Sequence, residues 1–365
     1  MSRHLRFTGA ALVVALVVPS SIDAQQDVNG GNGQLYFLTY ARTIKVLDES
    51  TFELVREIPL SVGLPLSMTV SQDRERIYVM DAGFEKVEVI DIASGASIDE
   101  FTLSEGNKTV RMWGFDIEPQ ERFAILLVKT TTKEIDRYAT TDATLLRYDL
   151  KTHEVTDTIS WPDGEERDFA GFMFSQDGEL AYFFADEMIA LETKGFTEVD
   201  RWALEHELDD GMGRFNFGFP SSVYEEPGFY TGLFRVTDPV QNRRMMGVAR
   251  VNLDERDVDF YMLGPSESVS FVLAPGREKA YGMRRQVGNY EFWTYDLEGR
   301  RIEKRQPFDG RPRMGLIASS NGQYLYVVTA GNTIDIYDAS TYELVRTVVL
   351  DADMMDSVLL PEDGE

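Results

Sequence analysis

The 365-residue chain contains no cysteine and few histidines. Without cysteine it can form no disulfide, no thiolate metal site and no CxxCH haem attachment, and it carries no lipoprotein anchor. The fold must therefore be held by packing alone. After the N-terminal leader described below, the only histidines are His153 and His206. His153 lies in a turn between predicted strands, and His206 lies in an acidic loop. We predict no metal site for this chain; the alternative is a cation held by His206 with Glu205, Glu207, Asp209 and Asp210.

Basic residues are also scarce. Lysine and arginine together number 36 against 62 aspartates and glutamates, which gives a formal net charge of −26. Such a surface repels nucleic acid and anionic lipid, and it favours cations or a basic protein partner. We therefore expect no nucleic-acid partner. The alternative is that the charge serves solubility alone, in a saline medium.

Long apolar runs are missing except near the N-terminus. Arg3 and Arg6 precede a short apolar run over 8–18, and residues 19–24 resemble a cleavage region. This pattern is typical of a secretory signal peptide, here residues 1–24. The apolar run is too short to cross a bilayer comfortably, and no later stretch approaches ~20 apolar residues. We predict a periplasmic or secreted protein that is not an integral membrane protein.

Motifs of common catalytic sites are absent from the sequence. It holds no P-loop, no HExxH, no nucleophile elbow and no GxGxxG between a strand and a helix. The sequence motifs therefore leave the catalytic residues unknown.

What the sequence does contain is a repeat of about 45 residues. Residues Thr43–Arg56 match Thr333–Arg346, and both are preceded by similar runs at Gln34–Leu38 and Gln323–Val327. Each unit has the same order: an apolar run, a turn, a strand ending near tyrosine, an alternating strand ending in aspartate, and a final alternating strand. Short alternating runs between turn residues are typical of antiparallel strands, and four of them per unit make a propeller blade.

Six complete units follow one another, with first turns near Asp73, Gln120, Asp177, Pro227, Gly276 and Asn321. A seventh is split, because the first unit has three strands and residues 354–360 resemble an innermost strand. We predict an all-β, seven-bladed β-propeller closed by pairing of the C-terminal strand with the N-terminal blade, which removes exposed sheet edges. The alternative, a β-sandwich, would not repeat one blade pattern six times. The predicted segments are 1–24 signal peptide, 25–33 linker, 34–360 propeller and 361–365 tail.

Two links between the second and third strands of a blade are long. Lys129–Ala143 interrupts the third blade and Arg235–Met246 interrupts the fifth. Long loops on a rigid scaffold commonly carry recognition, although they can also be neutral insertions. Their mixed charge and the side chains of Tyr138, Met245 and Met246 suit a protein interface.

Arginine stands at three entries into innermost strands, in alternate blades: Arg111, Arg214 and Arg313. If these side chains converge they would bind a carboxylate or an acidic partner segment. The alternative is local pairing with the abundant acidic residues. Trp113 beside Arg111 is a further candidate for partner binding, although aromatic residues on such strands mostly pack between blades.

The repeats at Ile77–Asp91 and Leu325–Asp338 resemble the YVTN family of propeller repeats. The mature chain is similar to the cofactor-free propeller subunit of quinohemoprotein amine dehydrogenase, in the order of its blades, in Ser175–Gly178 and Ser319–Gly322, and in its terminal Val-Leu-Leu strand. That resemblance implies a propeller without redox chemistry of its own. It implies partners with the cofactors, namely a dihaem c-type cytochrome and a small subunit with a cysteine-derived quinone.

Three functions are compatible with these observations. The first is an exported non-catalytic scaffold subunit of a periplasmic electron-transfer assembly, whose haem and quinone sit on its partners. The second is a stand-alone binding module. The third is a YVTN-like lactonase or lyase, which would need polar groups gathered at the axis.

Overall fold

A computed structural model describes residues 28–362 except 186, 204–215, 218–222, 227, 239, 287, 311–313 and 330. The predicted signal peptide lies outside these residues, as do Arg214, Arg313 and His206. The described residues form strands and turns, with no helix among them. No helix in the described part is long and apolar enough to cross a membrane.

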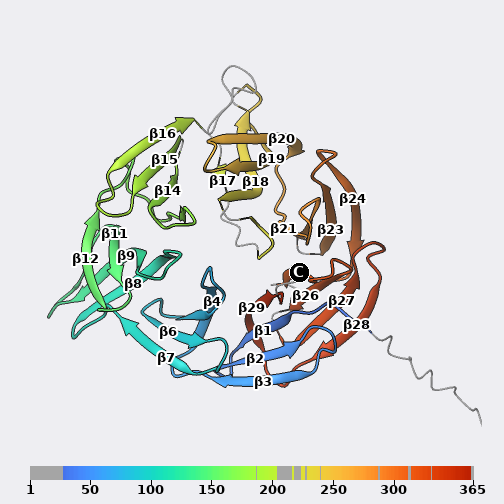
Figure 1. Cartoon of the computed structure of the whole chain (residues 1–365), viewed down its shortest axis with the longest axis horizontal. Helices are drawn as coiled ribbons and strands as arrows, with labels where there is room; N and C mark the ends of the chain where they lie inside the picture. Colours follow the sequence, from blue (N-terminus) through green and yellow to red (C-terminus); the bar gives the residue numbers. More distant parts are fainter. Residues whose placement is uncertain are drawn as a thin grey trace, which may run out of the picture.

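The strands form seven antiparallel sheets arranged in a ring (Figure 1). This confirms the predicted seven-bladed β-propeller. From inner to outer strand, blade 1 comprises β29 (Met354–Leu360), β1 (Gln34–Thr39), β2 (Thr43–Asp48) and β3 (Leu54–Pro59). Blade 2 comprises β4 (Pro65–Val70), β5 (Arg76–Asp81), β6 (Lys86–Asp91) and β7 (Ser97–Thr102). Blade 3 comprises β8 (Lys108–Ile117), β9 (Phe123–Lys133), β11 (Thr144–Asp149) and β12 (Glu154–Ile159), with β10 (Tyr138–Thr140) added beside β9.

Blade 4 comprises β13 (Phe172–Phe174), β14 (Leu180–Phe184), β15 (Glu187–Glu192) and β16 (Glu198–Ala203). Blade 5 comprises β17 (Asn216–Phe217), β18 (Phe229–Asp238), β19 (Arg243–Asn252) and β20 (Asp257–Pro265). Blade 6 comprises β21 (Val272–Leu273), β22 (Lys279–Gln286), β23 (Asn289–Asp296) and β24 (Arg301–Phe308). Blade 7 comprises β25 (Met314–Ala318), β26 (Tyr324–Thr329), β27 (Thr333–Asp338) and β28 (Leu344–Val349).

Blade 1 closes the ring as the sequence predicts. The C-terminal strand β29 pairs antiparallel with β1, with Leu360 opposite Gln34 and Asp356 opposite Leu38. Closure satisfies the backbone groups that an open β1 edge would leave unpaired. Residues 28–33, predicted as part of a linker, are packed against the same blade: Val28 is buried, and the Gly33 amide donates to the carboxylate of Glu49 at 2.9 Å.

The core lies between blades, because alternate side chains of a strand point to opposite faces of its sheet. On β1, Leu35 and Phe37 pack against blade 7, whereas Tyr36 and Leu38 pack against blade 2. The second and third strands are therefore buried on both faces, and the outermost strands such as β3 stay largely exposed.

The aspartate that ends the third strand of many units has a structural role. The Asp48 carboxylate accepts the amide of Thr51 at 2.9 Å, and Asp338 does the same for Thr341 at 2.8 Å. The turn then needs a residue in the left-handed region. It is found in every blade, at Phe52, Gly95, His153, Phe196, Arg256, Arg300 and Tyr342. His153 is thus a turn residue, stacked on Tyr148 and bonded to Asp99.

Candidate partner-binding face

The ends of the strands define two faces of the ring. We call top face the one that carries the links between second and third strands and the links into the next inner strand. The lower face carries the remaining turns. Of the large apolar side chains that are exposed in the described residues, half lie on the top face, at Tyr40, Leu64, Trp113, Ile135, Tyr138, Phe169 and Val240. The others lie on outermost strands of the rim, and none lies in a described turn of the lower face.

The two long links are extended hairpins and not irregular loops. In blade 3, β9 continues to Lys133 and β10 pairs with it, so that residues 134–137 alone form the tip. In blade 5, β18 and β19 stay paired from Phe229–Asn252 to Asp238–Arg243. Backbone pairing gives these projections a defined strand register, which an irregular loop lacks.

Tyr138 and the two methionines have different surroundings. Tyr138 is 68% exposed on the blade 3 hairpin, next to the fully exposed tip residue Ile135. Met245 is half-buried, and Met246 is 1% exposed, with its sulfur accepting the amide of Glu267 at 3.4 Å. The structure therefore places Met246 in the core between blades 5 and 6, where its side chain is not accessible to a partner.

Trp113 and Arg111 lie together on β8. Trp113 stands at a bulge in the pairing of β8 with β9, which turns its side chain outward, and it is 44% exposed. It stacks on Phe84 of the β5–β6 turn, with ring centroids 4.7 Å apart. The Arg111 side chain is exposed and opposite Lys129. Arg214 and Arg313 lie outside the described residues, so convergence of the three arginines stays a prediction.

Sequence reasoning missed Phe84, Ile135 and Phe169 on this face. Each is a large apolar residue in a link between strands, where it cannot be buried within a blade. That contrast between residue type and position is the signal that would have found them.

Two aspartates on inner strands bridge neighbouring blades. The carboxylate of Asp116 on β8 accepts the amide of Phe172 on β13 at 3.1 Å, and that of Asp356 on β29 accepts the amide of Met68 on β4 at 2.8 Å. Burial raises the pKa of both groups, for Asp116 to about 7 against the opposing effect of its hydrogen bond. Asp116 keeps some solvent exposure although it lies deep among protein atoms.

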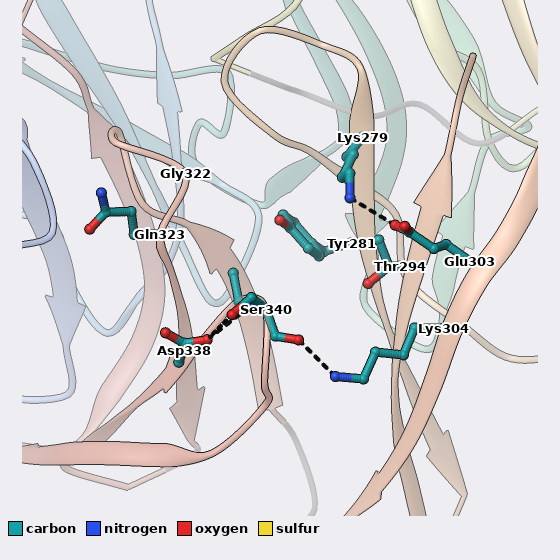
Figure 2. Close-up of a pocket in the computed structure, with 10 residues that line it drawn as sticks. Lys279, Tyr281, Thr294, Glu303, Lys304, Gly322, Gln323, Asp338 and Ser340 are labelled. Atoms are coloured by element: carbon teal, nitrogen blue, oxygen red, sulfur yellow. Dashed lines mark hydrogen bonds and ion pairs between the residues drawn. The ribbon is translucent and has the colours of Figure 1, made fainter. Parts of the chain in front are cut away.

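A cleft of about 600 Å³ lies between blades 6 and 7 on the lower side (Figure 2). Its charged groups already have partners. Lys279 pairs with Glu303 at 2.8 Å, Lys304 donates to the carbonyl of Ser340 at 2.7 Å, and Asp338 accepts from Ser340. Of these interactions only the hydrogen bond from Lys304 joins the two blades, and the cleft presents little unpaired charge to a ligand. Among the described residues, no three histidine or acidic side chains form a metal-binding group.

No protein-family model matches the chain, and no curated protein matches its sequence. Solved structures match its fold. A functionally unknown protein from Desulfotomaculum acetoxidans superimposes with a TM-score of 0.56 at 13% identity, over 91% of this chain and 100% of that one. The dihydro-heme d1 dehydrogenase NirN gives 0.51 at 12% identity, over 91% and 75%. Apo AztD from Citrobacter koseri gives 0.50 at 13% identity, over 90% and 98%. At such identities the likeness concerns the fold alone, and that fold is the seven-bladed β-propeller.

Proposed function

We propose that the chain is an exported, non-catalytic β-propeller that acts as the scaffold subunit of a protein assembly and binds its partners through the top face. The distribution of side chains carries this proposal. Exposed apolar residues gather on the top face and are missing from the described turns of the lower face. Large apolar side chains exposed on one face of an otherwise charged protein are typical of protein interfaces.

The assembly that we propose is a periplasmic electron-transfer complex. The resemblance to the propeller subunit of quinohemoprotein amine dehydrogenase supports this, and so does the fold shared with NirN, which is described as a dihydro-heme d1 dehydrogenase. The partners would be a c-type cytochrome and a small quinone-bearing subunit. In this proposal haem and quinone belong to those partners and the propeller binds neither.

The test is purification of the tagged full-length protein from its native periplasm, followed by an absorption spectrum of the eluate. We expect a haem Soret band and at least one stoichiometric partner. An eluate with neither haem absorbance nor a partner would overturn the proposal. A stoichiometric partner without haem would retain the scaffold and reject the electron-transfer assembly, in favour of the stand-alone binding module.

One observation favours a second candidate, a lactonase or lyase of the YVTN-like type. The carboxyl of Asp116 lies on an inner strand, and its pKa of about 7 suits general acid–base catalysis. If the protein turns over a lactone, Asp116→Asn will reduce that turnover by about 10²-fold or more. Wild-type turnover that survives the substitution would reject this candidate.

A further inference from the structure

We infer that one face of the blade 3 projection binds an acidic, extended segment of a protein partner. This inference rests on the proposed scaffold function and identifies the chemistry of its partner. We call this surface the basic hairpin face. It is formed by the upper ends of β8 and β9 together with β10, at Thr109, Arg111, Lys129, Thr131, Lys133, Tyr138 and Thr140.

Strand register places these side chains together. Residues directly opposite one another in an antiparallel pair share a face. Arg111 lies opposite Lys129, and Lys133 lies opposite Tyr138. Alternate residues of β9 share the same face, so these pairs form one surface. The hydroxyls of Thr131 and Thr140 confirm it, since they lie 3.4 Å apart.

The other side of these strands is core. Val110, Met112 and Val128 are buried and pack towards blade 2. The basic hairpin face therefore points away from that core, towards the link between blades 3 and 4. The Lys129 ammonium contacts Asp168 of that link at 2.6 Å, and the Asp168 side chain is itself 90% exposed.

The charge of this face is opposite to that of the protein. It holds three basic side chains and no acidic one, in a chain of net charge −26. Arg111 and Lys133 form no ion pair within the described part of the chain. Lys129 is partly neutralised by Asp168, whereas Arg111 directly opposite it on the sheet has no anionic partner of its own among the described residues. An anionic partner would supply the counter-charge that Arg111 and Lys133 lack there.

The spacing of the charges selects an extended chain over a small anion. Alternate residues of a strand lie about 6.7 Å apart, so the positions of Lys129 and Lys133 are separated by about 13 Å. A single carboxylate or phosphate cannot bridge that distance. An extended polypeptide with acidic residues four positions apart places its charges at the same spacing, and a row of acidic residues at alternate positions contains such pairs. The exposed Tyr138 offers an aromatic contact at the end of this row.

The acidic charge on the rest of the protein directs an acidic partner segment to the basic hairpin face. A net charge of −26 repels an acidic segment from the other surfaces, which confines its docking to the basic hairpin face. The same field disfavours a long polyanion such as nucleic acid, whose charges would extend over acidic surface. A protein segment with its acidic residues in one short stretch fits best.

Fluorescence anisotropy with the full mature protein tests the inference. The probe is a labelled peptide in which glutamate alternates with threonine, beside a matched lysine peptide and a single-stranded DNA of equal length. We expect the glutamate peptide to bind at 50 mM salt and to weaken at 300 mM. Arg111→Glu and Lys133→Glu should each raise its Kd at least tenfold. Lys151→Glu in the exposed lower turn of the same blade is the control and should change the Kd less than twofold.

Thermal unfolding of each variant will confirm that it is folded, and we expect the melting temperatures of these exposed variants to stay close to wild type. The inference is overturned if the glutamate peptide fails to bind, if neither reversal weakens it, or if DNA or the lysine peptide binds as tightly. The periplasmic purification separates the two proposals. If wild type and Arg111→Glu capture the same partner equally, the scaffold function stands and this face is not its docking site.

Discussion

The carboxylate of Glu49 in blade 1 accepts a 2.9 Å hydrogen bond from the hydroxyl of Tyr326 in blade 7. Both side chains are buried, and burial beside this carboxylate raises the pKa of Tyr326 far above its usual value, so the phenol stays protonated. Glu49 also accepts the backbone amides of Gly33 and Ser320. One buried carboxylate thus joins the N-terminal segment, the first blade and the last blade.

Removal of this contact should weaken ring closure. Glu49→Gln places an amide donor among groups that already donate, which leaves buried donors unpaired. We expect a loss of about 2–3 kcal/mol in the free energy of unfolding, measured by urea denaturation. Glu53→Gln, an exposed site in the same turn, is the control and should have no more than a small effect. Equal stability of both variants would contradict the role assigned to Glu49.

Deletion of the last strand should have a larger effect. Loss of residues 354–365 removes the inner strand of blade 1 and exposes Tyr36, Leu38 and the unpaired edge of β1. We expect cooperative thermal unfolding to disappear, as seen by calorimetry, together with aggregation through the open edge. A chain shortened by residues 363–365 alone should melt like wild type. A sharp transition after the longer deletion would disprove closure by β29.

The carboxyl of Asp116 should make stability depend on pH. Its folded pKa of about 7 lies above its ordinary value of 3.8, so the folded state holds a proton that the unfolded state releases between these values. The stabilisation is therefore complete below about pH 4 and is lost as the pH rises towards 7 and beyond. Asp116→Asn should remove this dependence and raise the stability at pH 8 by about 1–3 kcal/mol.

Unfolding of Asp116→Asn in urea at pH 5 and pH 8 will measure that change. The exposed Asp157→Asn in the same blade is the control and should leave the difference between the two pH values unaltered. A wild-type stability that does not fall between pH 5 and pH 8, relative to Asp116→Asn, would show that the carboxyl is not protonated in the fold.

Substitution of Trp113 should affect partner capture more than stability. The side chain is partly exposed and its main aromatic contact is Phe84, so Trp113→Ala should lower the melting temperature by only a few degrees. If the top face is the interface, the yield of co-purified partner should fall several-fold. Val155→Ala on the rim of the same blade, with similar exposure, is the control. Equal capture by both variants would place the interface elsewhere.

The sequence determined the architecture because the repeat is local. Each blade is a set of short alternating strands whose turns carry their own signals, such as Asp48 and Asp338 at equivalent turns. Even the long-range pairing of residues 354–360 with β1 followed from the repeat, since one unit lacked a strand that the C-terminus supplied. Signals of this kind lie within short stretches of sequence, so they can be recognised without any knowledge of distant contacts.

Tertiary structure alone decided which residues of the long links are accessible. Met245 and Met246 are neighbours of the same type, yet strand alternation buries one against blade 6 and leaves the other partly exposed. The basic hairpin face could not be predicted from the sequence, for the same reason. Arg111 and Lys133 are far apart in the chain, and only the register of β8, β9 and β10 places them on one surface. Composition determines net charge, whereas cross-strand register determines where that charge is locally reversed.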